Sequence, residues 1–278
     1  MKFAGLLVVL VISVGFAAGQ QPTIRQNQGV ENAASYTTSN PPGSLVAIFG
    51  SNLSGETLLA SSTPLTAQIQ SKTETISVTV NGKASPMFYA TPNQASVQLP
   101  WETIAGTGSM VVTRNGVKSS AYSFHVATFS PGIFTTTQDG KGMAWVINND
   151  DGTVAQPAAG WPFPTIKTRA AKAGDNLYFY ITGLGPVAPS ISDGHAPCPL
   201  SGCPAGVVLP KTTTPPTILV GGVAIPSANL QFSGLSPQFV GTYQVNFQMP
   251  SGIPANDKTT LQVEIGNANS NTVTFATQ

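Results

Sequence analysis

Two histidines are the only side chains in this sequence that could act as the usual base of a nucleophilic catalytic triad. His125 lies in residues 122–126, where polar and apolar residues alternate as they do in a β-strand. His195 follows Asp193 and Gly194 in a segment rich in Gly and Pro, which is typical of a turn. Neither histidine is accompanied by a Gly-x-Ser-x-Gly motif. The patterns therefore favour a strand position and a turn over a triad.

Carboxylates could support two other chemistries. Hydrolysis of a glycosidic bond needs a carboxyl group on each side of the bond, and the spacing of the 11 acidic residues selects no such pair. Asn148, Asn149, Asp150 and Asp151 could offer oxygen ligands to Ca²⁺, but they lack the order of an EF-hand loop and its distal Glu, which favours a plain turn. The chain also lacks phosphate-binding and dinucleotide motifs. We therefore predict no catalytic residues, no metal site and no cofactor.

Aromatic side chains offer the remaining chemistry, because a ring face packs well against the C–H side of a sugar. Trp161 and Phe163 alternate with prolines, and Trp101 directly follows a proline that ends a predicted strand. These three residues are the candidate ligand-binding residues. Packing at a domain junction is the alternative, and it is the more common role for such side chains. Trp145 lies inside an apolar run and is expected in the core.

Cys198 and Cys203 are the only cysteines, in the pattern Cys-Pro-Leu-Ser-Gly-Cys. In an oxidising compartment such a pair closes a small loop, whereas a metal site would need two further ligands and only His195 is close. We predict a disulfide, whose stabilisation is modest because the loop is short.

The first 19 residues have the three parts of a secretory signal peptide. Lys2 supplies the positive start, residues 6–16 form the apolar run, and Ala17-Ala18-Gly19 offers small side chains for cleavage. The run is shorter than the roughly 20 residues of a membrane span, and no later stretch is longer. We therefore expect an exported protein, secreted, periplasmic or on the cell surface, with no membrane insertion.

The composition narrows the possible partners. Charged residues make up 8% of the chain and the net charge is +1, which excludes an electrostatic surface for nucleic acid. Hydrophobic residues make up 41%, which is enough for a packed core.

An internal repeat defines the domain organisation. Residues 94–100 (Gln-Ala-Ser-Val-Gln-Leu-Pro) recur as residues 244–250 (Gln-Val-Asn-Phe-Gln-Met-Pro), with the same alternation of polar and apolar residues and the same terminal proline. Similar strand and turn patterns flank both copies, including Asn81-Gly82 before the first and Gly221-Gly222 before the second. We predict two homologous domains, residues 28–127 and 172–278, joined by a partly structured linker, residues 128–171.

Short strands, Gly, Pro and Asn turns, and about 100 residues per unit are typical of immunoglobulin-like β-sandwiches. The predicted fold class is therefore all-β, with two tandem sandwiches. A barrel or one large sandwich is the alternative.

The sequence resembles the Solibacter-type uncharacterised C-terminal domain family of exported acidobacterial proteins, which is similar to a tandem of IPT/TIG immunoglobulin-like domains. The resemblance covers nearly the whole chain after residue 19 and is carried by ordered blocks. These include residues 42–53, 80–94, 130–134, 182–187 and 241–246. It implies the sandwich fold and a location outside the cytoplasm, and it implies no catalytic residues.

These observations predict a non-catalytic binding or adhesion module outside the cytoplasm, whose partner is a polysaccharide or another envelope protein. A structural spacer of the cell envelope is the main alternative, and a secreted hydrolase is a more distant one. The sandwich fold hosts all of these functions, so the fold does not decide between them.

Overall fold

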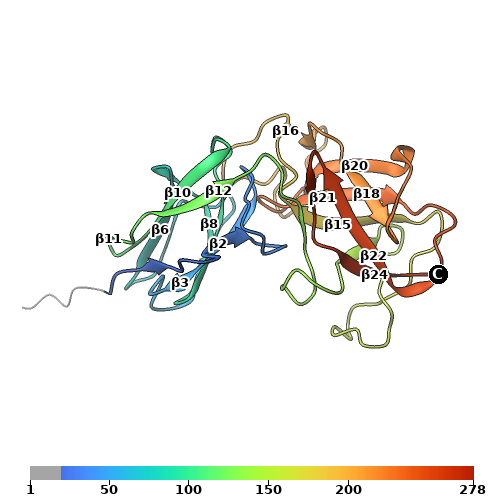
Figure 1. The fold of residues 1–278 in the computed structure, drawn as a ribbon, viewed down its shortest axis with the longest axis horizontal. Helices are drawn as coiled ribbons and strands as arrows, with labels where there is room; N and C mark the ends of the chain where they lie inside the picture. The colour runs from blue at the N-terminus through green and yellow to red at the C-terminus, as the bar shows by residue number, and fades with distance from the viewer. Residues whose placement is uncertain (1–19) are drawn as a thin grey trace, which may run out of the picture.

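The structure, a computed structural model, describes residues 20–278, and the predicted signal peptide lies outside the described residues. Two β-sandwiches lie side by side along the long axis of the molecule (Figure 1). Regular structure in the described residues is β-strand apart from one short 3-10 helix, η1 (Ser227–Asn229). No helix within residues 20–278 has the length and apolar character needed to cross a bilayer. The all-β tandem-sandwich fold predicted from the sequence is confirmed.

The first sandwich contains two antiparallel sheets of six strands each. The first sheet consists of β1 (Thr23–Ile24), β2 (Val30–Asn32), β3 (Leu45–Ser51), β4 (Leu58–Leu59), β8 (Met87–Ala90) and β9 (Gln94–Gln98). The second sheet consists of β5 (Gln68–Gln70), β6 (Thr75–Val80), β7 (Lys83–Ala84), β10 (Gly106–Arg114), β11 (Val117–Lys118) and β12 (Tyr122–Val126).

The second sandwich repeats this plan with a third and a fourth sheet. The third sheet consists of β13 (Gly132–Ile133), β14 (Val146–Asn148), β15 (Asn176–Thr182), β16 (Val187–Ala188), β17 (Lys211–Thr212), β20 (Leu230–Leu235) and β21 (Tyr243–Gln248). The fourth sheet consists of β18 (Thr217–Val220), β19 (Val223–Ala224), β22 (Asn256–Ile265), β23 (Ala268–Asn269) and β24 (Val273–Thr277). Because β13 and β14 both pair with β15, the segment expected as a linker contributes two strands to this sandwich.

Each sandwich has its own hydrophobic core between its two sheets. In the first, Val46 and Val97 meet Val78 and Val112 from the opposite sheet. In the second, the corresponding core contains Phe179, Phe247 and Phe275, among others. Burial of this apolar surface is the main term that stabilises each sandwich.

The repeated segments form β9 and β21, which occupy equivalent places beside β3 and β15. In β21 the apolar residues are buried, and Gln244, Asn246 and Gln248 remain at least partly exposed on the outer face. In β9 the last residue of the outer face is covered, because Gln98 is fully buried and its Oε1 accepts a hydrogen bond of 2.6 Å from Gly194 N of the second sandwich. The same sequence pattern therefore occurs in two strands whose outer faces have different environments.

Hydrogen bonds join the two sandwiches directly. Asn32 Nδ2 donates to Ser130 O at 2.8 Å, and Leu45 N donates to Thr182 Oγ1 at 3.0 Å. All four residues are buried. A buried polar group without a hydrogen-bond partner raises the free energy of the folded protein. Moving the sandwiches apart would break these bonds, so the bonds favour one defined arrangement of the sandwiches.

Candidate functional site

An aromatic cluster forms on the second sandwich, where the residue before β14 meets the Pro-rich loop. Ring centroids lie 5.4 Å apart for Trp145 and Trp161, 5.1 Å for Trp145 and Phe163, and 5.3 Å for Trp161 and Phe163. All three side chains are half-buried, so part of each ring stays accessible. The expectation that Trp145 lies in the core is wrong, because the neighbouring Val146 is the residue that points into the core.

A cleft of about 540 Å³ lies between the sandwiches, and Trp145 forms part of its wall. The first sandwich contributes residues of β3, β8 and β9, and the second contributes the segment between β13 and β14. Five of the 14 residues in the lining are aromatic: Tyr36, Phe88, Tyr89, Phe134 and Trp145.

A β-bulge explains why two consecutive aromatic residues face this cleft. The register between β8 and β9 shifts between Met87 and Tyr89, so that Phe88 is the extra residue. A regular strand would send Phe88 and Tyr89 to opposite faces, but after the bulge both are half-buried while Met87 and Ala90 stay in the core. The bulge therefore places both rings on the outer face of the first sheet.

Two residues that line the cleft, Tyr36 and Gln138, have strained backbones. Both have left-handed backbones, with φ values of 58° and 55°, which cost a side-chain-bearing residue about 1 kcal/mol or more. The Tyr36 hydroxyl donates to the Gln138 carbonyl oxygen, which ties the segment before β3 to the segment after β13. Strain of this kind is concentrated at functional sites in proteins.

The two tyrosines of the cleft keep their hydroxyl protons. Burial raises the pKa of Tyr89, and the neighbouring Tyr36 adds to this shift. Burial also raises the pKa of Tyr36, together with the carboxylates of Asp139 and Glu31. Both groups therefore stay neutral at physiological pH. The Tyr36 proton is donated to the Gln138 carbonyl oxygen, and the Tyr89 hydroxyl keeps its proton as a donor.

No residue that lines the cleft carries a charge. The polar groups are amides and hydroxyls, contributed by Gln94, Ser96, Thr135, Thr137 and Gln138. A lining of ring faces and neutral hydrogen-bonding groups suits a ligand with apolar C–H faces and many hydroxyl groups. It gives no compensation for the cost of removing a charged ligand from water.

The structure places Trp101 apart from Trp161 and Phe163. Its ring packs against the core of the second sandwich and against Gly43, where a Cβ would lie only 2.3 Å from the ring. Its backbone N donates to Asp193 Oδ1 at 2.8 Å. Trp101 is therefore a contact between the sandwiches, and the ligand-binding role predicted for all three residues stays a prediction.

The two histidines lie at separate positions with simple local contacts. His125 is exposed on β12, and its Nδ1 is 3.1 Å from Ser39 Oγ. His195 is exposed in a loop, and its Nδ1 is 3.0 Å from Asp193 O, a backbone oxygen rather than a carboxylate.

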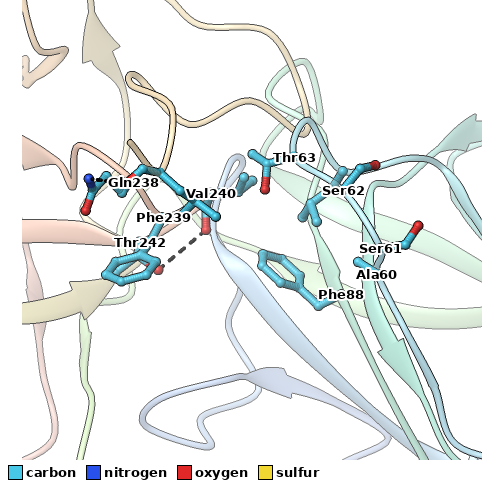
Figure 2. A pocket seen from close by; sticks show the side chains of 11 residues that line it. Ala60, Ser61, Ser62, Thr63, Phe88, Gln238, Phe239, Val240 and Thr242 are labelled. Carbon is cyan, nitrogen blue, oxygen red and sulfur yellow. Dashed lines mark hydrogen bonds between the residues drawn. The ribbon is translucent and has the colours of Figure 1, made fainter. Parts of the chain in front are cut away.

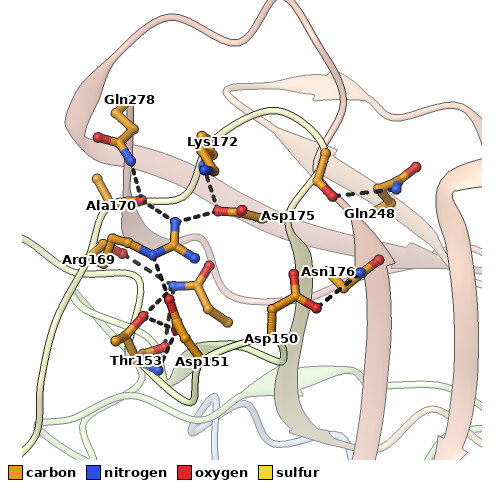
Figure 3. Close-up of polar contacts among 12 residues, drawn as sticks. Asp150, Asp151, Thr153, Arg169, Ala170, Lys172, Asp175, Asn176, Gln248 and Gln278 are labelled. Atoms are coloured by element: carbon orange, nitrogen blue, oxygen red, sulfur yellow. Dashed lines mark hydrogen bonds and ion pairs between the residues drawn. The ribbon is translucent and has the colours of Figure 1, made fainter.

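The acidic residues near β14 are engaged by protein groups (Figure 3). Asp151 Oδ1 accepts bonds from Thr153 N and Oγ1, and Arg169 Nε donates to its Oδ2 at 2.9 Å. The bonds from Thr153, with Arg169, lower the pKa of Asp151 to about 2. Arg169 also pairs with Asp175 at 2.7 Å. Among residues 20–278, no three His, Cys, Asp or Glu side chains are grouped as a metal site would require.

The predicted disulfide between Cys198 and Cys203 is present. Cys198 is buried, and its backbone N donates to Pro237 O at 2.7 Å, so the closed loop is held against the segment that follows β20.

Tyr36, Phe88, Tyr89 and Phe134 were not predicted from the sequence. β8 is a strand of 4 residues without polar and apolar alternation, and the other two residues lie outside long strands, so no periodic pattern identified them. The pair of adjacent aromatic residues at 88–89 was the available signal.

The fold and the cleft define a protein of two tandem immunoglobulin-like sandwiches with an aromatic groove between them. The model of the IPT/TIG domain family matches residues 34–126, which lie in the first sandwich. No curated protein matches the chain.

Several solved structures are similar to the chain over most of its length. The surface glycan-binding protein SGBP-B of the Bacteroides ovatus mixed-linkage glucan utilization locus, in complex with a heptasaccharide, is 13% identical with a TM-score of 0.36, and the match covers 93% of this chain and 46% of that one. PbSGBP-B of Prevotella bryantii is 14% identical with a TM-score of 0.27, covering 90% and 41%. The adhesin InvE of Yersinia pseudotuberculosis is 13% identical with a TM-score of 0.21, covering 94% and 61%. The chain spans less than half the length of the two glycan-binding proteins.

Proposed function

We propose that this protein is an exported, non-catalytic module that binds a neutral polysaccharide in the cleft between its sandwiches. The observation that carries this proposal is the convergence of five aromatic side chains from both sandwiches on a cleft whose lining has no charge. Ring faces supply apolar contact with sugar rings, and the surrounding amides and hydroxyls pair with sugar hydroxyls.

The aromatic cluster extends this binding surface beyond the cleft. Trp145 belongs to both, because its ring lines the cleft and contacts Trp161 and Phe163. Mutual packing and the flanking prolines hold the rings in defined directions before a ligand arrives, which reduces the entropy cost of binding.

Two features support a location outside the cytoplasm. Residues 1–19 have the pattern of a signal peptide, and the Cys198–Cys203 disulfide is stable in oxidising compartments. The ordered blocks shared with the Solibacter-type family support membership of that family.

The experiment compares the wild type with the double variant Trp161→Ala/Phe163→Ala on an array of neutral polysaccharides, followed by calorimetric titration. We expect binding at least about tenfold weaker, which corresponds to about 1.4 kcal/mol. The melting temperature should fall by no more than about 4 °C, because both side chains are half-buried and, unlike Trp101, belong to neither hydrophobic core. Ile104→Ala, at a residue that is 80% exposed and outside the cleft, is the matched control.

A rigid spacer is the second candidate function, and the buried hydrogen bonds between the sandwiches favour it. A spacer needs a fixed arrangement of its domains and no ligand. If the wild type binds no polysaccharide on the array, the binding proposal fails and the spacer takes its place.

A further inference from the structure

A second cleft, of about 430 Å³, lies between the sandwiches (Figure 2). The first sandwich contributes residues 60–63 and Leu65, from the connection that follows β4. The second contributes Leu200, residues 238–240 and Thr242, the last four from the connection before β21. Its lining again combines aromatic rings with hydroxyl groups and an amide, and carries no charged side chain.

Phe88 lines both clefts. It is the extra residue of the β8 bulge, which brings its ring out of the core and into the space between the sandwiches. Since one residue borders both spaces, the two clefts are neighbours at Phe88.

Phe239 gives the second cleft a ring on the wall opposite Phe88, as Figure 2 shows. Phe239 is 46% exposed, so part of its ring is open to solvent. It is also held in place from behind, because its ring packs edge-to-face on Tyr180 at 5.5 Å, and Tyr180 packs on Tyr178 at 5.7 Å. A supported ring with one free side is a preformed stacking surface.

Hydroxyl groups lie beside these two rings. Ser61, Ser62 and Thr63 line the cleft from the first sandwich, and Gln238 lines it from the second. All four are neutral, as are the polar groups of the first cleft. The second cleft therefore has the same chemistry as the first.

We propose that the two clefts form one extended site, in which a linear neutral polysaccharide passes over Phe88 and stacks on Phe239. This inference rests on the proposed function and adds the form of the ligand to it. The protein recognises an internal segment of a chain rather than a chain end or a short oligosaccharide, because the ligand occupies both clefts and contacts the rings of each.

The test uses the neutral polysaccharide that the wild type retains on the array, partially hydrolysed and sorted by length. Affinity should rise at least fivefold from the shortest bound fragments to the longest. Phe239→Ala should weaken binding of the long fragments about fivefold and abolish the dependence on length, while Trp145→Ala weakens binding of every fragment. Val223→Ala, at a residue that is 64% exposed on the fourth sheet, is the control for loss of an exposed apolar side chain.

The outcomes separate the two proposals. Equal affinity for short and long fragments, with Phe239→Ala indistinguishable from the wild type, overturns the extended site and leaves the first cleft as the binding site. Absence of binding to any neutral polysaccharide overturns both. Because Phe239 is exposed, its replacement leaves both cores intact, and unchanged melting of the variant verifies this.

Discussion

At the scale of single residues, no charged side chain lines either of the two clefts. The clefts contain only neutral polar groups, whereas the buried carboxylate of Glu74 lies in the first sandwich with a full set of partners. Ser54 Oγ and Gly55 N each donate to it at 2.7 Å, and Arg114 Nε donates at 2.8 Å. Burial acts to raise the pKa of Glu74, but these bonds and the charge of Arg114 outweigh it, so the pKa lies below its ordinary value.

This arrangement predicts a stability that depends on pH. Since the pKa of Glu74 is lower in the folded than in the unfolded protein, its contribution is present above the unfolded value near 4.5 and is lost as the pH falls through the folded value. Glu74→Gln should therefore lower the free energy of unfolding by about 2 kcal/mol at pH 7, and by much less at pH 3. Urea unfolding of both proteins at the two pH values measures this. A loss of the same size at pH 3 would contradict it, and exposed Glu56→Gln is the control.

At the scale of strands, local patterns were sufficient to predict the fold. Polar and apolar alternation identified β9 and β21, and Asn81-Gly82 forms the expected hairpin turn with φ values of 50° and 82°. The clefts were not predictable in this way, because they depend on the bulge at Phe88 and on which strand faces meet across the junction. Those features arise from contacts between residues far apart in the sequence, which no local period records.

The disulfide that closes the Cys198–Cys203 loop should stabilise the loop without being needed for the fold of either sandwich. A disulfide that closes a short loop removes little conformational entropy from the unfolded chain, so Cys198→Ser/Cys203→Ser should lower the free energy of unfolding by about 2 kcal/mol. Both sandwiches should keep their strands, because neither sulfur is needed to pair them. Circular dichroism checks the fold and thermal unfolding checks the stability. Loss of the β-sheet spectrum at 25 °C would contradict this prediction, because it would show that the sandwiches need the disulfide to fold.

At the scale of the whole molecule, the proposed site exists only while the sandwiches keep their arrangement, since each cleft takes walls from both. Asn32, Leu45 and Gln98 make hydrogen bonds across the junction, and Trp101 adds apolar contact. The junction therefore supports the proposed binding site even at positions that line neither cleft, and a change there should act on both clefts together.

Trp101→Ala tests whether both clefts depend on the junction between the sandwiches. Removing a half-buried Trp between the sandwiches should lower the free energy of unfolding by about 3 kcal/mol, because the ring contacts the second core and leaves a void beside Gly43. Polysaccharide binding should weaken for short and long fragments alike, since both clefts lose their fixed walls. Small-angle scattering should show a larger radius of gyration, and limited proteolysis should cut between the sandwiches. Weaker binding with unchanged melting and unchanged scattering would instead mean that Trp101 touches the ligand itself, as the sequence pattern first suggested. Trp101→Phe keeps an aromatic wedge beside Gly43, so it should recover most of the stability and the binding if the junction is what matters.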